Sequence, residues 1–313
     1  MSKNSKPILV IAGDTKSVFL EIFFKSFKKS KRNLILIVNK DILVFNIRLL
    51  NLKLQINEIR TDDIYNKNLK KNFINFINVS FNADKENKYI EKCFDIALKL
   101  IQKDKKIQLI NGPINKKNFL ANKFVGITEY LASKTKCKNK EVMLIYNTNL
   151  SVSPLTTHIP VKKIHLNISK IKIINHVKKI NNFYLKTHKK KPKIAITGLN
   201  PHCESNFKSS EEERIIIPTI KDLVKKKYSV SGPYPADTIF LRKNYKKFDT
   251  IIGMYHDQVL APIKSIYNFK AINITLGLPF LRVSPDHGPN TEMFGKNLSD
   301  PTSLLEALKF LNK

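Results

Sequence analysis

Two kinds of apolar pattern alternate along the 313-residue chain. Short uninterrupted runs of Val, Ile and Leu are typical of buried strands, and longer segments with apolar residues every three or four positions are typical of amphipathic helices. Strand patterns cover residues 6–13, 33–38, 107–110, 141–147, 150–156, 193–198, 249–255 and 271–277, and helical patterns cover residues 17–27, 89–101, 167–187, 211–224 and 302–311. This alternation predicts an α/β fold with mostly parallel sheets and flanking helices.

The length of the chain refines this prediction. A chain of 313 residues exceeds the size at which one hydrophobic core usually stops growing, so two α/β domains are expected. Residues 40–75 are the least readable part and suggest a divergent surface region. Between the last strand pattern and the last helical pattern, a loop is expected.

Three of the seven histidines follow predicted strands, namely His158 in TTH, His202 in NPH and His256 in YHD. A single histidine after a strand is more often a loop or core residue than a ligand. Three in matching positions are a stronger signal, because ligands of open α/β sheets gather at the carboxyl ends of the strands. Three imidazoles at one edge could hold a metal ion and leave a coordination position for substrate. The pattern favours an enzyme.

The net charge of +31 changes this picture little. Only six of the 56 basic residues are arginine, and the lysines are spread over every segment, whereas nucleic-acid binding favours a localised patch that often contains arginine. A diffuse positive field favours an anionic substrate by electrostatic steering. Nucleic acid is therefore not the expected partner, although a basic nucleic-acid-binding protein stays as an alternative supported by charge alone.

The cysteines and the apolar runs indicate the compartment. Cys93, Cys137 and Cys203 are odd in number and widely spaced, which favours a reducing environment over a disulfide framework. The apolar run near the N-terminus is too short for a signal peptide, and no stretch of 18 apolar residues follows. A cytoplasmic protein without membrane association is expected.

Seven motifs stand in order along the chain: NGPINK (111–116), GITEYL (126–131), TTHIP (156–160), GLNPH (198–202), GPYPADTIF (232–240), YHDQVLAPIK (255–264) and NITLGLPFLRVSPDHGP (273–289). This series closely resembles the 4-hydroxythreonine-4-phosphate dehydrogenase (PdxA) family of vitamin B6 biosynthesis. The resemblance implies an isocitrate-dehydrogenase-like fold with a first domain of residues 1–127 plus about 286–313 and a second of residues 128–285. It also implies a homodimer with the active site at the subunit interface.

The resemblance carries over to particular residues. The family's three metal-binding histidines fall on His158, His202 and His256, the same three that follow strands. Its contacts to the anionic substrate fall on Thr128, Lys264, Asn273 and Arg282. Lysine suits a phosphate or carboxylate as a point charge, and arginine suits it as a bidentate fork. A solvated lysine and a structural ion pair of the arginine are the plainer alternatives.

The chain also departs from the family pattern. Ile127 stands where the family usually has a histidine, and isoleucine cannot donate to phosphate, so Lys116 or Lys117 nearby could replace that contact. The segments 13–21 and 203–213 have lost glycines that the family has there. These changes bear on the exact substrate and cofactor preference more than on the metal chemistry.

The function implied by the resemblance is NAD- or NADP-dependent oxidation of 4-phosphonooxy-L-threonine, assisted by a divalent metal, with zinc expected before cobalt or magnesium. Asp237 and Asp257 are candidates for acid–base catalysis or for orienting a metal-bound histidine, with helix capping as the equal alternative. Without a glycine-rich dinucleotide fingerprint, the cofactor-binding residues stay unassigned. A sibling dehydrogenase of another phosphorylated hydroxy acid, such as a four-carbon sugar-acid 4-phosphate, is the alternative that Ile127 keeps open.

Overall fold

The computed structural model describes residues 6–65, 69–114, 124, 126–203 and 209–312. The chain divides into two compact units. Unit 1 comprises Met1–Leu131 and Leu278–Lys313, and unit 2 comprises Ala132–Gly277. The boundaries expected from the sequence lay at residues 127 and 285. The second boundary differs because the strand that contains Arg282 pairs within unit 1.

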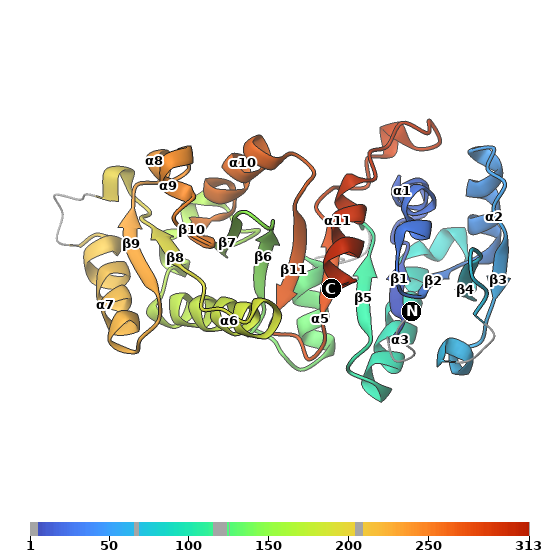
Figure 1. Ribbon diagram of the computed structural model, residues 1–313, viewed down its shortest axis with the longest axis horizontal. Helices are drawn as coiled ribbons and strands as arrows, with labels where there is room; N and C mark the ends of the chain where they lie inside the picture. Colours follow the sequence, from blue (N-terminus) through green and yellow to red (C-terminus); the bar gives the residue numbers. More distant parts are fainter. Residues whose placement is uncertain (1–5, 66–68, 115–123, 125, 204–208, 313) are drawn as a thin grey trace. The chain divides into compact units, whose positions relative to one another are not determined.

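Unit 1 contains a parallel sheet in which the described strands follow the order β3-β4-β2-β1-β5-β12 (Figure 1). The strands are β1 (Ile8–Ile11), β2 (Leu34–Val38), β3 (Ile56–Glu58), β4 (Ile74–Asn78), β5 (Gln108–Asn111) and β12 (Arg282–Pro285), and the helices are α1 (Phe19–Ser26), α2 (Lys40–Leu49), α3 (Glu86–Lys103), α5 (Ile127–Lys134, which runs past the unit's boundary) and α11 (Thr302–Leu311). β1 and β2 are buried along their whole length, as their uninterrupted apolar runs predict.

Two segments of unit 1 differ from the sequence-based expectation. Residues 40–75, expected to be a divergent surface region, contain α2, β3 and the start of β4, and β4 pairs with β2 inside the sheet. Asn39 caps α2 by accepting from the backbone N–H groups of Asp41 and Ile42. The expected loop before the last helix contains β12, in which Arg282 and Val283 pair with β5. Four residues that begin with arginine and end with proline carry too little pattern to predict a strand.

Unit 2 contains strands in the order β11-β6-β7-β10-β8-β9 among the residues described. They are β6 (Val142–Tyr146), β7 (Ser151–Thr156), β8 (Ile194–Thr197), β9 (Val230–Tyr234), β10 (Thr250–Tyr255) and β11 (Ile272–Leu276). β7, β10, β8 and β9 are parallel, whereas β6 runs antiparallel to both β11 and β7. The prediction that the three strands preceding His158, His202 and His256 are parallel is therefore confirmed.

The helices of unit 2 are α6 (Lys170–His188), α7 (Ile217–Lys225), α8 (Ala236–Ile239), α9 (Arg242–Tyr245) and α10 (His256–Tyr267) (Figure 1). α10 covers the sheet through Val259, Leu260 and Ile263, which pack in one cluster with Val152 of β7 and Ile251 of β10. α6 packs against β6, β7 and β11 and also contacts α7. A π-helical turn, Glu212–Ile216, precedes α7. No helix within the described ranges is both long and apolar enough to cross a membrane.

Candidate active site

The sheet of unit 2 brings two of the three candidate histidines together. His158 follows the end of β7, and His256 follows β10 directly as the first residue of α10. β7 and β10 are parallel neighbours with Thr156 opposite Tyr255, so their loops leave the sheet side by side. The two imidazole rings have centroids 5.7 Å apart and are tilted by 42°.

Asp257 orients the ring of His256. Its Oδ1 lies 2.6 Å from His256 Nδ1. Because a carboxylate accepts, Nδ1 carries the proton in this contact, and Nε2 is the ring nitrogen left to bind a ligand. Asp257 has an 83% exposed side chain, so the contact serves the histidine more than it serves the packing of the unit.

His202 lies in a tight turn after β8. The turn comprises Pro201–Cys203, and both His202 (φ 58°) and Cys203 (φ 57°) adopt the left-handed conformation that non-glycine residues rarely take. Glu212 holds the residues just before this turn, because its Oε1 accepts from the backbone N–H groups of Leu199 (2.7 Å) and Asn200 (2.9 Å). Burial alone would raise the pKa of Glu212, but these hydrogen bonds outweigh burial and lower the pKa.

The donor chemistry of this edge fits a divalent metal. Neutral imidazoles are common ligands of zinc and related ions, and the pair His158 and His256 offers two of them on adjacent loops. Within the part of the chain that the structure describes, no group of three or more His, Cys, Asp or Glu side chains is arranged to hold a metal ion. The described residues of one chain thus bring together a pair of histidines and do not add His202 to it.

Arg282 lies in unit 1 and is buried. It begins β12, has an exposure of 4%, and its Nε donates to Asn111 Oδ1 at 2.7 Å. Burial lowers the pKa of Arg282 to about 10, and the charge of Glu129 acts in the opposite direction. Thr128 and Glu129 share the first turn of α5. The structure therefore gathers Arg282, Asn111 and Glu129 in unit 1, and the influence of Glu129 is in keeping with the structural ion pair considered above.

The remaining candidates of unit 2 lie on separate elements. Lys264 is exposed on α10, two helical turns after His256. Asn273 lies within β11 opposite Ile145 of β6, and so is not at the strand ends that carry the histidines. The Oδ1 of Asn273 is buried without a hydrogen-bond partner among the described residues. Asp237 is exposed in the first turn of α8, which packs against the turn of His202.

The departures from the family pattern have local explanations. Ile127 packs against the core cluster of unit 1. In segment 13–21, Thr15 donates through its N–H (3.0 Å) and its Oγ1 (2.6 Å) to Glu86 Oε1, which anchors the rebuilt turn on α3. Lys116 and Lys117, the suggested replacements for the lost phosphate contact, lie outside the described residues. Of segment 203–213, residues 204–208 also lie outside them.

Sequence reasoning missed the residues that hold these candidates in place. Asn111, Glu129 and Gln258 lie inside the motifs that carry the family resemblance, but no local pattern indicates that they bond to distant residues. Glu212 begins a predicted helix, where an acidic residue is ordinary. For Asn111, Glu129 and Gln258, the position inside a motif was the available signal.

Known proteins are similar to this chain along nearly its whole length. The family model described as pyridoxal phosphate biosynthetic protein PdxA matches residues 30–311. A 4-hydroxythreonine-4-phosphate dehydrogenase of Sulfurihydrogenibium sp. is 38% identical over 96% of both chains. A putative D-threonate 4-phosphate dehydrogenase of Oceanobacillus iheyensis is 36% identical over 68% of this chain and 65% of its own.

Solved structures are also similar to this chain. A putative 4-hydroxythreonine-4-phosphate dehydrogenase from Salmonella typhimurium superposes with a TM-score of 0.84 at 25% identity, covering 99% of both chains. Isocitrate dehydrogenase from Methylococcus capsulatus matches with a TM-score of 0.51 at 11% identity, covering 96% of this chain and 83% of its own, which confirms the predicted fold class. The prediction of an oxidoreductase is confirmed as well. The ordered motifs, the parallel histidine-bearing strands and these matches agree that the chain belongs to the PdxA family.

Proposed function

We propose that this protein oxidises 4-phosphonooxy-L-threonine to 2-amino-3-oxo-4-phosphonooxybutanoate with NAD or NADP and a divalent metal, in pyridoxal 5′-phosphate biosynthesis. The observation that carries the proposal is the pair His158 and His256 on adjacent loops, in a chain of the PdxA family. The relative from Sulfurihydrogenibium sp., which bears the name of this activity, matches along 96% of its length and supports the proposal.

The reaction removes a hydride and a proton from the secondary alcohol and leaves a ketone. The product is a β-keto acid, and it loses CO₂ to give 3-amino-2-oxopropyl phosphate because the ketone stabilises the electron pair left behind. A divalent metal on His158, His202 and His256, zinc before cobalt or magnesium, would act as a Lewis acid and lower the pKa of the substrate hydroxyl. A bound nicotinamide would accept the hydride.

The chain's own residues bind and orient the substrate. Asp257 keeps the proton of His256 on Nδ1, so that Nε2 faces the site as a ligand. Arg282, with Thr128 of α5, is assigned the phosphate or carboxylate, and the exposed Lys264 adds a positive charge. The buried Oδ1 of Asn273 can accept a hydrogen bond from a donor group of the substrate. Asp237 is the remaining acid–base candidate, near the turn of His202.

A sibling activity is the second candidate. The Oceanobacillus iheyensis relative is named for D-threonate 4-phosphate, and this chain carries Ile127 in place of the family's usual histidine. D-threonate 4-phosphate has a hydroxyl where 4-phosphonooxy-L-threonine has an amine. Discrimination between the two therefore depends on polar contacts around that carbon, which loop changes can alter.

We also propose that the protein is a cytoplasmic homodimer with the active site at the subunit interface. The family resemblance supports the dimer, and an odd number of widely spaced cysteines suits a reducing compartment. His202 stands apart from the histidine pair among the described residues of one chain, which agrees with a site completed by a second copy.

The deciding experiment measures reduction of NAD and NADP by the purified protein with 4-phosphonooxy-L-threonine and, separately, with D-threonate 4-phosphate. Each assay is run with a chelator and after adding back zinc, cobalt or magnesium. Metal-dependent turnover of the first substrate supports the proposal. Turnover of D-threonate 4-phosphate alone moves the assignment to the sibling activity. No turnover of either substrate by a folded, metal-loaded sample contradicts both.

A further inference from the structure

Gln258 joins the two loops that carry His256 and His202. It lies on α10, two residues after His256, and its side chain is buried with an exposure of 8%. Its Oε1 accepts from the backbone N–H of Met254 at 2.6 Å and from Thr197 Oγ1 at 2.9 Å, and its Nε2 donates to the carbonyl of Gly198 at 2.8 Å. One amide group thus bridges the ends of β10 and β8.

Two further buried side chains extend this bridge. Thr156, at the end of β7, donates from Oγ1 to the carbonyl of Met254 at 2.8 Å. Glu212 Oε2 accepts from Asn200 Nδ2 at 2.7 Å, in addition to its backbone contacts before the turn of His202. We call Thr156, Thr197, Glu212 and Gln258 the carboxyl-end framework. All four are at least 92% buried, so water does not compete for these hydrogen bonds.

Two glycines allow the framework to form. A Cβ on Gly253 would lie 2.9 Å from Gln258 Oε1 and 2.3 Å from Val259 Cγ1. On Gly198, a Cβ would lie 2.9 Å from Glu212 Oε1 and 2.7 Å from Cys203 Sγ. Gly253 within β10 and Gly198 just after β8 therefore have no side chain where the framework approaches the backbone, so this close approach depends on glycine.

We propose that Gln258 is a positioning residue that holds the His202 and His256 loops in place at their strand ends, and so sets the metal affinity of the sites to which these histidines contribute. This inference rests on the proposed function, because it requires that the histidines bind a metal. The links run between strand ends rather than within one loop, so losing them loosens the loops that follow the paired strands β8 and β10. Removing a group that holds a metal ligand in place typically lowers metal affinity about 10–100-fold.

The test replaces Gln258 by methionine, which has a similar length and volume and neither an amide donor nor an amide acceptor. Zinc affinity is measured on the full-length protein by chelator competition, and the cobalt-substituted protein is followed by visible absorption, which reports ligand geometry. We expect Gln258→Met to bind zinc about 10-fold or more weakly with an altered cobalt spectrum. The matched control is Tyr184→Phe, which removes buried hydrogen bonds elsewhere in the same unit and should leave affinity and spectrum unchanged.

A milder variant keeps the test decisive if Gln258→Met does not fold. Thr197→Val removes one framework donor without changing side-chain shape, and it should weaken zinc binding in the same direction by a smaller factor. The positioning role is overturned if both folded framework variants show wild-type affinity and spectrum. If Gln258→Met fails to fold, the same result in Thr197→Val alone overturns it. Either result leaves the proposed function standing. A wild-type protein that binds no metal at the histidines would overturn the metal-dependent function and this inference with it.

Discussion

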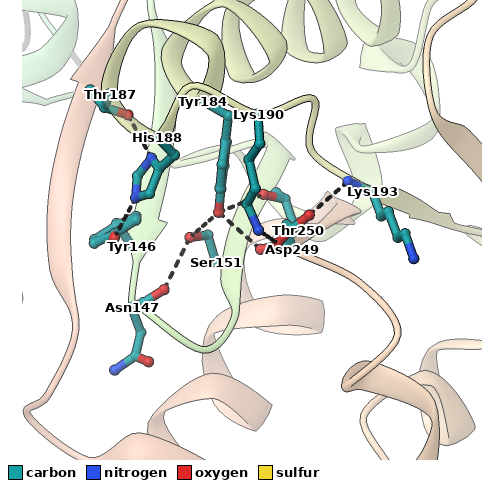
Figure 2. A network of polar contacts seen from close by, with 10 residues as sticks. All are labelled: Tyr146, Asn147, Ser151, Tyr184, Thr187, His188, Lys190, Lys193, Asp249 and Thr250. Atoms are coloured by element: carbon teal, nitrogen blue, oxygen red, sulfur yellow. Dashed lines mark hydrogen bonds and ion pairs between the residues drawn. The ribbon is translucent and has the colours of Figure 1, made fainter.

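The two ends of strands β7 and β10 are both held by buried polar groups, but to different effect. At the amino ends, Tyr184 of α6 stands between Ser151 and Thr250, with its OH 3.0 Å from Ser151 Oγ and 3.3 Å from Thr250 Oγ1 (Figure 2). The same OH donates to the carbonyl of Asp249 at 3.0 Å. At the carboxyl ends, Gln258 and Thr156 hold the backbone, and the loops beyond them present His158 and His256.

The polar groups at the amino end bond to one another and to nearby backbone groups. Asp249 accepts from Lys190 Nζ and from the backbone N–H of Lys193, and His188 bonds Tyr146 at one ring nitrogen and Thr187 at the other (Figure 2). Burial raises the pKa of Tyr184, so its OH stays protonated as a donor. At the carboxyl end, the loops beyond the buried hydrogen bonds carry His158 and His256. Similar buried polar groups therefore serve the fold at one end and, under the proposed function, also position the metal-binding loops at the other.

The largest expected effect tests whether the carboxyl end holds a metal. His202→Ala should abolish binding of a divalent metal and lower kcat/KM about 1,000-fold or more, because several kcal/mol of stabilisation of the transition state would be lost. The fold should be retained, because His202 lies in a surface turn. Metal content is measured by elemental analysis and folding by circular dichroism. Undiminished metal in the folded variant would remove His202 from the ligand set.

The carboxyl end of β5 in unit 1, at Asn111, allows a second test. Arg282→Lys should raise KM for the phosphorylated substrate about 10–100-fold with a smaller change in kcat, because a fork with five N–H groups becomes a point charge. Asn111→Leu removes the acceptor at 2.7 Å from Arg282 Nε and should shift KM in the same direction by less. Steady-state kinetics check both variants. Unchanged KM in Arg282→Lys would leave Arg282 a purely structural residue.

Packing of His176 against the middle of β7 should make the stability of the protein depend on pH. His176 of α6 is buried against the carbonyls of Pro154 (3.2 Å) and Lys172 (2.9 Å), and burial lowers its pKa to about 4 from 6.5. The unfolded chain therefore takes up this proton first as pH falls. Stability should drop progressively between about pH 6.5 and pH 4, by at most about 3 kcal/mol, and change no further from this group below pH 4.

The check on His176 is chemical denaturation at a series of pH values, with His176→Gln as the comparison. Glutamine keeps a donor near these carbonyls and has no titration in this range, so the variant should lack that part of the slope. Identical slopes in the two proteins would show that His176 does not cause the loss of stability in acid.

The smallest effect tests the amino end directly. Tyr184→Phe should lower the free energy of unfolding by about 1–2 kcal/mol, because Ser151, Thr250 and Asp249 lose a buried partner. kcat, KM and metal affinity should stay at wild-type values, since the network lies at the other end of the strands. Urea denaturation and steady-state kinetics are measured on one preparation. A loss of metal affinity in this variant would break the contrast between the two ends.

Much of the fold was predictable because its signals are local. The buried strands β1, β2 and β10 appear as uninterrupted apolar runs, and α3 and α6 show helical periodicity. β12 was not predictable, because four residues that begin with a buried Arg282 resemble a loop until β5 is placed beside them. The antiparallel course of β6 was also hidden, since a strand's pattern does not state the direction of its neighbours.

The sequence by itself determined that this chain alternates strands and helices, that three histidines follow parallel strands, and that its ordered motifs are those of the PdxA family. These features depend on spacing along the chain, which a linear pattern records. The tertiary structure alone decided that β7 and β10 are neighbours, so that His158 meets His256, and that Gln258 reaches Thr197, 61 residues away. Such contacts follow from the pairing order of the strands, which depends on the packing of the whole unit.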